Sequence, residues 1–173
     1  MNLHPIFKIA GVGALALAAM ASPVRMTAQA GDTVLKAADA QKLLPTSVFY
    51  HGQSAPTQAR NSGGVKFADG SYVLAVLVDT AGYSDSVAAK YQGYFIAETP
   101  IKLDGKKLPA GAYGFGFTSD NKFVLTDIGG HDVLAVAFAT DEAIKRPMPL
   151  LVQAEPGGGF RLYTGRKYVH FSR

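Results

Sequence analysis

The 173-residue chain contains no cysteine. This absence excludes a disulfide framework, a cysteine nucleophile and a thiolate metal site. Histidines are few and widely separated, and no H-x-H or H-E-x-x-H spacing gathers them, so we predict no metal site. No glycine-rich phosphate loop precedes a helix either, and we expect no cofactor.

Clustered positive charge is also missing. The chain carries 17 lysines and arginines against 13 acidic residues, and its basic residues are scattered apart from a few adjacent pairs such as Lys106-Lys107. A nucleic-acid partner requires a basic stripe or patch. We therefore expect no DNA or RNA partner.

The first 30 residues have the three parts of a secretory signal peptide. Lys8 gives a basic start, residues 9–21 form an apolar run, and small-x-small sites end at Ala21 and Ala30. The apolar run is shorter than the ~20 residues that a bilayer crossing needs. We predict cleavage after Ala30, in preference to Ala21, and export to the periplasm or the extracellular space of a bacterium. A retained N-terminal anchor is the alternative.

The remaining chain, residues 31–173, is interpreted as a single β domain, long enough for a core without covalent cross-links. No later segment is long and apolar enough for a membrane helix, so we expect no stable membrane span after removal of the signal. One N-terminal helix is predicted over Thr33–Leu44, because Pro45 stops it and apolar residues share one face. A weaker helical turn is predicted over Ser84–Lys90.

Elsewhere the sequence alternates between turn residues and segments rich in β-branched and aromatic side chains. We predict strands at about residues 47–53, 56–61, 65–67, 71–79, 92–98, 100–103, 111–118, 122–127, 132–139, 149–154, 159–164 and 167–171. Asn61–Gly64 is among the predicted turns. Short turns make neighbouring strands antiparallel. The predicted fold class is all-β, either an antiparallel barrel or a two-sheet sandwich.

The hydrophobic pattern also indicates where individual strands lie. Tyr72–Val78 and Val133–Ala139 are apolar on both faces and are predicted to be central. Phe160–Phe171 alternates and is predicted to form a half-exposed hairpin near an edge. In Gly111–Phe117 the aromatic residues share one face and the glycines share the other. We expect a large residue, or else a ligand, to pack over those glycines.

The segment Lys106–Phe115, with the preceding Asp104-Gly105 turn, resembles the G-x-x-L-P-A-G-x-Y hairpin of small exported bacterial β-sandwich domains of unknown function. The resemblance covers about a dozen residues, 104–115. It implies a β-sandwich fold, and it brings no catalytic residues with it.

A polar run within Ser47–Phe67 is the first candidate for a ligand-binding surface, because paired amides and an arginine offer directional hydrogen bonds. The predicted ligand-binding residues are Tyr50, His51, Gln53, Gln58, Arg60, Asn61, Tyr113 and Phe115. A hydrolytic centre with His51 as base and Ser54 or Thr57 as nucleophile is the alternative, but no G-x-S-x-G motif surrounds Ser54.

The sequence therefore predicts an exported envelope protein whose β domain binds a small molecule or an envelope component without catalysis. Such a domain should contain a cavity of roughly 300–1,000 Å³. The first alternative is an accessory protein that offers a strand edge to a partner. The second is a hydrolase, which should bring at least two of a set of side chains together in a cleft. That set is His51, Glu98, Asp127, His131 and Asp141.

Overall fold

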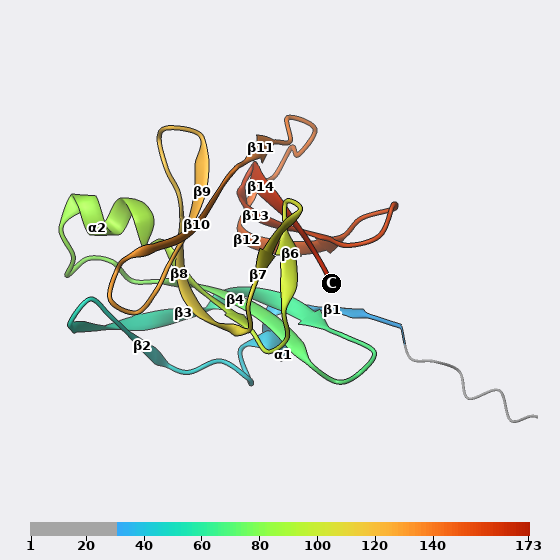
Figure 1. Ribbon diagram of the computed structural model, residues 1–173, viewed down its shortest axis with the longest axis horizontal. Helices are drawn as coiled ribbons and strands as arrows, with labels where there is room; N and C mark the ends of the chain where they lie inside the picture. Colours follow the sequence, from blue (N-terminus) through green and yellow to red (C-terminus); the bar gives the residue numbers. More distant parts are fainter. Residues whose placement is uncertain (1–30) are drawn as a thin grey trace, which may run out of the picture.

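The computed structural model describes residues 31–173, which form two antiparallel β-sheets with two short helices (Figure 1). The predicted signal peptide and both of its candidate cleavage sites lie outside the described residues. The sheets face each other and do not close into one, so the sandwich is confirmed and the barrel alternative is excluded. Neither helix within residues 31–173 has the length and hydropathy that a membrane crossing requires.

The first sheet has eight strands. They are β1 (Thr33–Leu35), β2 (Ser47–Tyr50), β3 (Gln53–Lys66), β4 (Tyr72–Val78), β5 (Gly93–Ala97), β8 (Gly111–Phe117), β9 (Lys122–Thr126) and β10 (Asp132–Ala137). Their order is β1-β3-β4-β5-β8-β9-β10, with β2 paired to β3. Sequence neighbours are mostly sheet neighbours because tight turns join them.

The second sheet has six strands. They are β6 (Ile101–Leu103), β7 (Lys106–Leu108), β11 (Ala139–Thr140), β12 (Met148–Ala154), β13 (Phe160–Gly165) and β14 (Lys167–Ser172). Their order is β12-β13-β14-β6-β7, and β11 pairs with β14. The β6–β7 hairpin leaves the first sheet after β5 and enters the second, where Leu103 pairs with Phe171.

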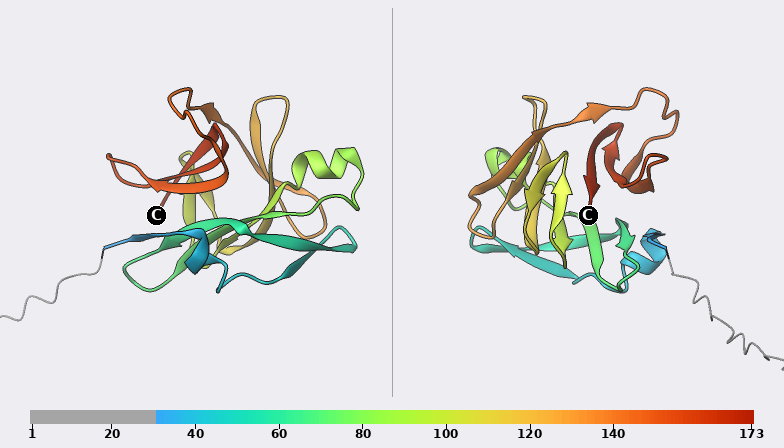
Figure 2. Two further views of the ribbon diagram at one scale, coloured as in Figure 1. Left: turned by 180° about the vertical axis from the view of Figure 1, so that it is seen from behind. Right: turned by 45° about the vertical axis from the view of Figure 1, so that its right-hand side comes forward.

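Figure 2 shows the two sheets from two further directions. Aromatic side chains from both sheets fill the core between them. Phe95 of the first sheet meets Phe171 of the second edge-on, with ring centroids 6.2 Å apart. Tyr113, Phe115 and Phe117 all point into this core, as the alternation predicted. Edge-to-face contacts of this kind add to the stabilisation that burial of the rings gives.

The glycine face of β8 is covered by the second helix, α2 (Asp85–Lys90), and the residue after it. A Cβ added to Gly114 would strike the ring of Tyr91, and one added to Gly116 would lie 2.6 Å from the carbonyl oxygen of Ala89. The prediction of a large residue over the glycines is therefore confirmed. The bare backbone strip is filled by the protein itself.

The N-terminal helix is shorter than predicted. Only α1 (Ala37–Ala40) is helical, while Thr33–Leu35 forms β1 and pairs with Gly64–Lys66 of β3. The β-branched Thr33 and Val34 suit a strand, and the open edge of β3 offers them hydrogen bonds that an isolated helical turn would lack.

The predicted turn at Asn61–Gly64 is wrong, because these residues continue β3. A Cβ on Gly64 would collide with the backbone oxygen of Val73, and one on Gly63 would lie 3.4 Å from a methyl group of Val152. The glycines therefore permit close packing against β4 and β12, and they do not reverse the chain.

Two predicted strand positions also differ. The segment Tyr72–Val78 is central, as expected, but β10 is at the edge of the first sheet, and Val133 is 44% exposed. The β13–β14 hairpin lies inside the second sheet instead of near its edge. An apolar run can be half exposed at an edge, so periodicity alone did not distinguish these positions.

We expect Gly116→Val and Gly114→Val to destabilise the domain by about 2–3 kcal/mol each, because the added atoms would overlap backbone or a fixed ring. The matched control is Ala112→Val, which lies on the same face of β8 but is exposed, and should change stability by less than about 0.5 kcal/mol. Urea unfolding measures all three. Equal stability of the glycine variants and wild type would contradict the packing of α2 on β8.

Candidate functional site

The predicted ligand-binding run begins with a tight hairpin turn. His51 and Gly52 connect β2 to β3 with φ angles of 47° and 84°, the two left-handed residues typical of a type I′ turn. The backbone N–H of His51 donates to the carbonyl of Ile128 at 3.0 Å. His51 is thus an exposed turn residue.

The amides farther along the run hold a bulge in β3. The register of β3 against β4 shifts between Gln58 and Ser62, so the residues between them have no partner opposite. Asn61 Nδ2 donates to Gln58 Oε1 at 2.8 Å. Gln58 Nε2 donates to the carbonyl of Val78 at 3.2 Å, and Ser62 Oγ donates to that of Ala59 at 2.6 Å. The side-chain amides and the serine hydroxyl therefore form hydrogen bonds within the bulge and to the neighbouring strand.

The other predicted residues lie apart. Gln53 and Arg60 are exposed on β3, whereas Tyr113 and Phe115 belong to the core between the sheets. Tyr50 is buried at the far end of the first sheet. The structure does not bring the eight residues around one cavity, and ligand binding by them stays a prediction.

Tyr50 is part of a tyrosine cluster beside α2. Its ring stacks on that of Tyr91 with centroids 3.7 Å apart, and Tyr83 meets both rings edge-on. Burial raises the pKa of Tyr91, whose hydroxyl has no hydrogen-bond partner among residues 31–173. The cluster is a second small core, and only its hydroxyl groups are polar.

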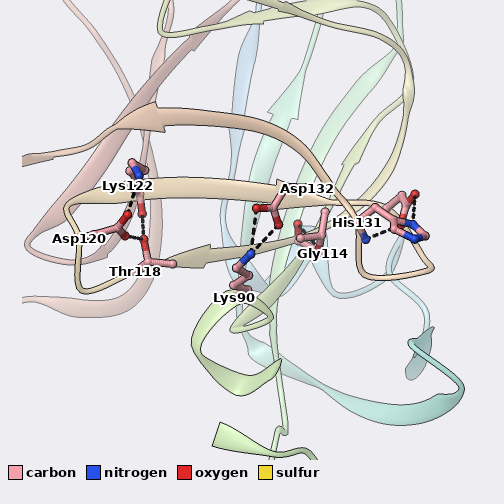
Figure 3. A network of polar contacts seen from close by, with 9 residues as sticks. Lys90, Gly114, Thr118, Asp120, Lys122, His131 and Asp132 are labelled. Carbon is pink, nitrogen blue, oxygen red and sulfur yellow. Dashed lines mark hydrogen bonds and ion pairs between the residues drawn. The ribbon is translucent and has the colours of Figure 1, made fainter. Parts of the chain in front are cut away.

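Two of the five side chains proposed for a hydrolase, Asp127 and His131, do meet. They lie at the turn between β9 and β10, where Figure 3 labels His131. His131 Nδ1 lies 3.1 Å from Asp127 Oδ2, and the backbone N–H of His131, which donates to Asp127 Oδ1 at 2.9 Å, lowers the pKa of that carboxyl. Beside them Lys90 binds both carboxylate oxygens of Asp132 at 2.8 Å. The His131 side chain is 82% exposed, so this pair lies on an open turn and not in a cleft.

The three histidines of the described chain are not gathered. His51 lies in the β2–β3 turn, His131 in the β9–β10 turn and His170 on β14. Within residues 31–173, no three side chains of the histidine or acidic kind are arranged to hold a metal ion.

A denser charged network lies on the outer face of the β13–β14 hairpin. Glu155, just after β12, uses both carboxylate oxygens: Arg161 Nε donates to Oε1 at 3.1 Å, and His170 Nδ1 lies 2.7 Å from Oε2. Arg161 and His170 are directly opposite in the strand register. The hydrogen bond from Arg161 lowers the pKa of Glu155. One carboxylate therefore joins two neighbouring strands.

Two tyrosines fix the arginine of this network. The guanidinium of Arg161 lies over the ring of Tyr168, 4.6 Å from its centroid, and also donates to Tyr163 Oη at 3.4 Å. Tyr163 in turn donates to Asp141 Oδ2 at 3.2 Å. Cation–π and charge-assisted contacts together restrain this face of the second sheet.

A polar hollow of about 120 Å³ opens beside His170. Its polar side chains are Lys102, Asp104, Glu155, His170 and Ser172. A water molecule takes about 30 Å³ in the liquid, so the space suits only a few polar atoms. Because donors and acceptors of both charges surround it, it could receive a small hydrophilic group.

A larger hollow of about 480 Å³ adjoins the polar hollow, and Lys102 lines both. Pro100, Ile101, Leu108 and Pro109 form its apolar part, and Lys102, Lys107 and Arg173 supply positive charge. We call this groove the apolar hollow. It combines an apolar surface with cations at one place. Strand β6, which carries part of it, lies near the C-terminus in Figure 1.

The β6–β7 hairpin builds this groove. Asp104 and Gly105 turn the chain with φ angles of 46° and 79°, so Lys102 faces Lys107 and Ile101 faces Leu108. Ile101 and Leu108 are almost fully buried, which anchors the hairpin in the core.

The remaining wall of the apolar hollow is the Arg173 side chain. It donates to Asp69 Oδ2 at 2.6 Å and to Thr99 Oγ1 at 3.3 Å, and its guanidinium lies 4.9 Å from the ring centroid of Phe67. Hydrogen bonds from Ser71, and then the one from Arg173, lower the pKa of Asp69 to about 2. The charge of Arg173 is thus balanced.

A third hollow, of about 400 Å³, lies between α1 and β12. Ala37, Ala38, Leu150 and Val152 line it, with Lys36 and Ser62. Ser62 Oγ already donates to a carbonyl. This third hollow therefore offers a ligand fewer polar side chains than the apolar hollow and the polar hollow at the β6–β7 hairpin.

No protein-family model, no curated protein and no solved structure matches this chain. The resemblance of residues 104–115 to exported β-sandwich domains therefore stays a prediction.

The residues of the apolar hollow were not predicted from the sequence, although part of the signal was present. A two-residue Asp104-Gly105 turn places Lys102 opposite Lys107, and this pairing can be read from the sequence once the turn is assigned. Arg173 carried no such signal, because its place beside Pro100 depends on the pairing of β14 with β6.

We expect Glu155→Gln to lower stability at pH 7 by about 1 kcal/mol, because it removes the charge that Arg161 and His170 share. The folded pKa of Glu155 is below its ordinary 4.5. Its contribution is therefore complete above pH 4.5 and is lost as the pH falls through the lower folded value. The difference from wild type should shrink between pH 7 and pH 3.

Urea unfolding at both pH values measures this effect. The control is Glu142→Gln, an exposed acid in a loop, for which we expect no change beyond about 0.5 kcal/mol. A deficit of the Glu155 variant that stayed constant from pH 7 to pH 3 would show that the ionised carboxylate is not what stabilises the hairpin.

A matched pair of variants tests the two buried tyrosine hydroxyls. Tyr91→Phe removes a hydroxyl without a partner in the described chain and should leave stability unchanged or raise it by about 1 kcal/mol. Tyr163→Phe removes the bonds to Arg161 and Asp141 and should cost about 1 kcal/mol. Thermal unfolding compares them, and the opposite order would contradict the assigned hydrogen bonds.

Proposed function

We propose that this domain binds a small molecule without chemical conversion, and that the apolar hollow is the binding site. The observation that carries the proposal is a groove of about 480 Å³ with apolar walls and cationic side chains. This volume falls in the roughly 300–1,000 Å³ range of small-molecule sites. The groove is lined by proline and aliphatic side chains, and not by the aromatic residues that the sequence suggested.

The support for a preformed site comes from the hairpin that carries it. Ile101 is 3% exposed and Leu108 is 1% exposed, so both strands of the hairpin are anchored in the core. Asp69 and Thr99 hold the Arg173 wall. A ligand would pay little conformational entropy to order such a site.

The adjoining polar hollow extends the same site. A ligand with an apolar body on Pro100 and Pro109 could place a hydrophilic group next to Lys102 and His170. Given the signal peptide that the sequence predicts, we propose that the ligand is met outside the cytoplasm, as an envelope component or an external small molecule.

The test uses 1-octanol, a neutral probe with an apolar chain, followed by amide chemical-shift mapping of the folded protein. We expect saturable shifts at Ile101, Lys102 and Leu108, and none at Gln53 or Arg60. Shifts confined to the β2–β3 run would restore the site predicted from the sequence and contradict the proposal.

Two neighbouring substitutions provide the matched control. Pro109→Phe puts a ring into the apolar hollow and keeps the carbonyl that accepts from Tyr113 Oη at 3.0 Å, so the hairpin should stay folded while octanol binds at least about tenfold more weakly. Ala110→Phe is exposed and does not line the hollow, so it should bind as wild type does. Equal weakening by both would indicate a general disturbance of the hairpin.

A further inference from the structure

Two lysines stand directly opposite each other at the rim of the apolar hollow. Lys102 of β6 pairs with Lys107 of β7, and both side chains are exposed. Opposite residues of an antiparallel pair have Cβ atoms about 5 Å apart, and like charges at such positions destabilise a sheet. The hairpin therefore carries a repulsion that its fold does not need.

No direct ion pair in the described chain neutralises these two lysines, although Lys102 shares the polar hollow with Asp104 and Glu155. Within residues 31–173, no ion pair joins Lys102 or Lys107 to a carboxylate. The neighbouring cationic side chains, by contrast, have partners. Arg173 forms an ion pair with Asp69, and Lys106 Nζ donates to the carbonyl of Ala135 at 2.9 Å. The positive charge left without a partner thus lies at the edge of the apolar surface.

We propose that the apolar hollow selects amphiphilic organic anions, with the apolar part of the ligand on Pro100, Pro109 and the aliphatic stems of the two lysines, and its anionic group between the ammonium groups of Lys102 and Lys107. This inference rests on the proposed function and adds the chemical class of the ligand. A carboxylate or a phosphate monoester fits equally, because lysine ammonium groups act as mobile point charges without the planar geometry of arginine.

A bound anion supplies the negative charge that Lys102 and Lys107 lack. It can accept charge-assisted hydrogen bonds from both ammonium groups and convert their repulsion into attraction. Beside the low-dielectric floor of the groove, such a charge interaction is screened less than it would be in bulk water. A neutral ligand of the same shape would gain the apolar contact alone.

The first experiment compares octanoate, octyl phosphate and 1-octanol as ligands of the folded protein, by titration calorimetry below any micelle-forming concentration. We expect each anion to bind about tenfold more tightly than octanol, with an advantage that decreases at high salt. Equal affinity of the alcohol and the anions would overturn the anion inference and leave the binding function intact. Failure of all three to bind would instead contradict the proposed function.

The second experiment replaces the lysines singly, as Lys102→Gln and Lys107→Gln, with Lys145→Gln as the control. Lys145 is exposed in the loop after β11 and does not line the hollow. Each rim variant should bind octanoate at least fivefold more weakly and octanol as before, while the control should be unchanged for both.

The same variants report on stability without ligand. Because each removes one of two opposed charges, the rim variants should melt at the wild-type temperature or slightly above it. A lower melting temperature together with unchanged octanoate affinity would assign the lysines a structural role and overturn the inference. Weaker octanoate binding in a domain of unchanged or higher stability would support it.

Discussion

The close packing of side chains on both faces of β8 is the contact on which the rest of the structure depends. On the inner face, Phe115 and its aromatic neighbours fill the space between the sheets. On the outer face, Tyr91 and the end of α2 reach the backbone itself, because Gly114 and Gly116 have no side chains. Because the chain has no cysteine, this two-sided burial stabilises the domain without any disulfide cross-link.

This packing also determines where the hollows lie. Ala97 at the end of β5 pairs with Gly111 at the start of β8, so the residues between them must leave the first sheet and return to it. They do so as the β6–β7 hairpin, whose free side then pairs with β14 through Leu103 and Phe171. A hairpin fixed at its base and along one edge is a rigid carrier for a binding groove.

Local turn chemistry explains which parts of the fold could be predicted. Asp104-Gly105 was assigned correctly because both residues tolerate positive φ and short strands flank them. The same reasoning failed at Gly63 and Gly64, where glycine serves close packing against Val152 and Val73, a property of the assembled sheets. The Glu155, Arg161 and His170 network was missed because its members come together only through strand register.

The charged side chains of the second sheet fall into two groups, those with a partner of opposite charge among residues 31–173 and those without one. Arg161 is balanced by Glu155 and Arg173 by Asp69, each at a place where the partner also holds two chain segments together. Lys102 and Lys107 lie opposite each other, and neither forms an ion pair that links two segments of the described chain. Like charges at opposite positions weaken a hairpin. Since sequences tend to agree with their fold at every level except at functional sites, we propose that a ligand completes this uncompensated pair of charges beside the apolar hollow.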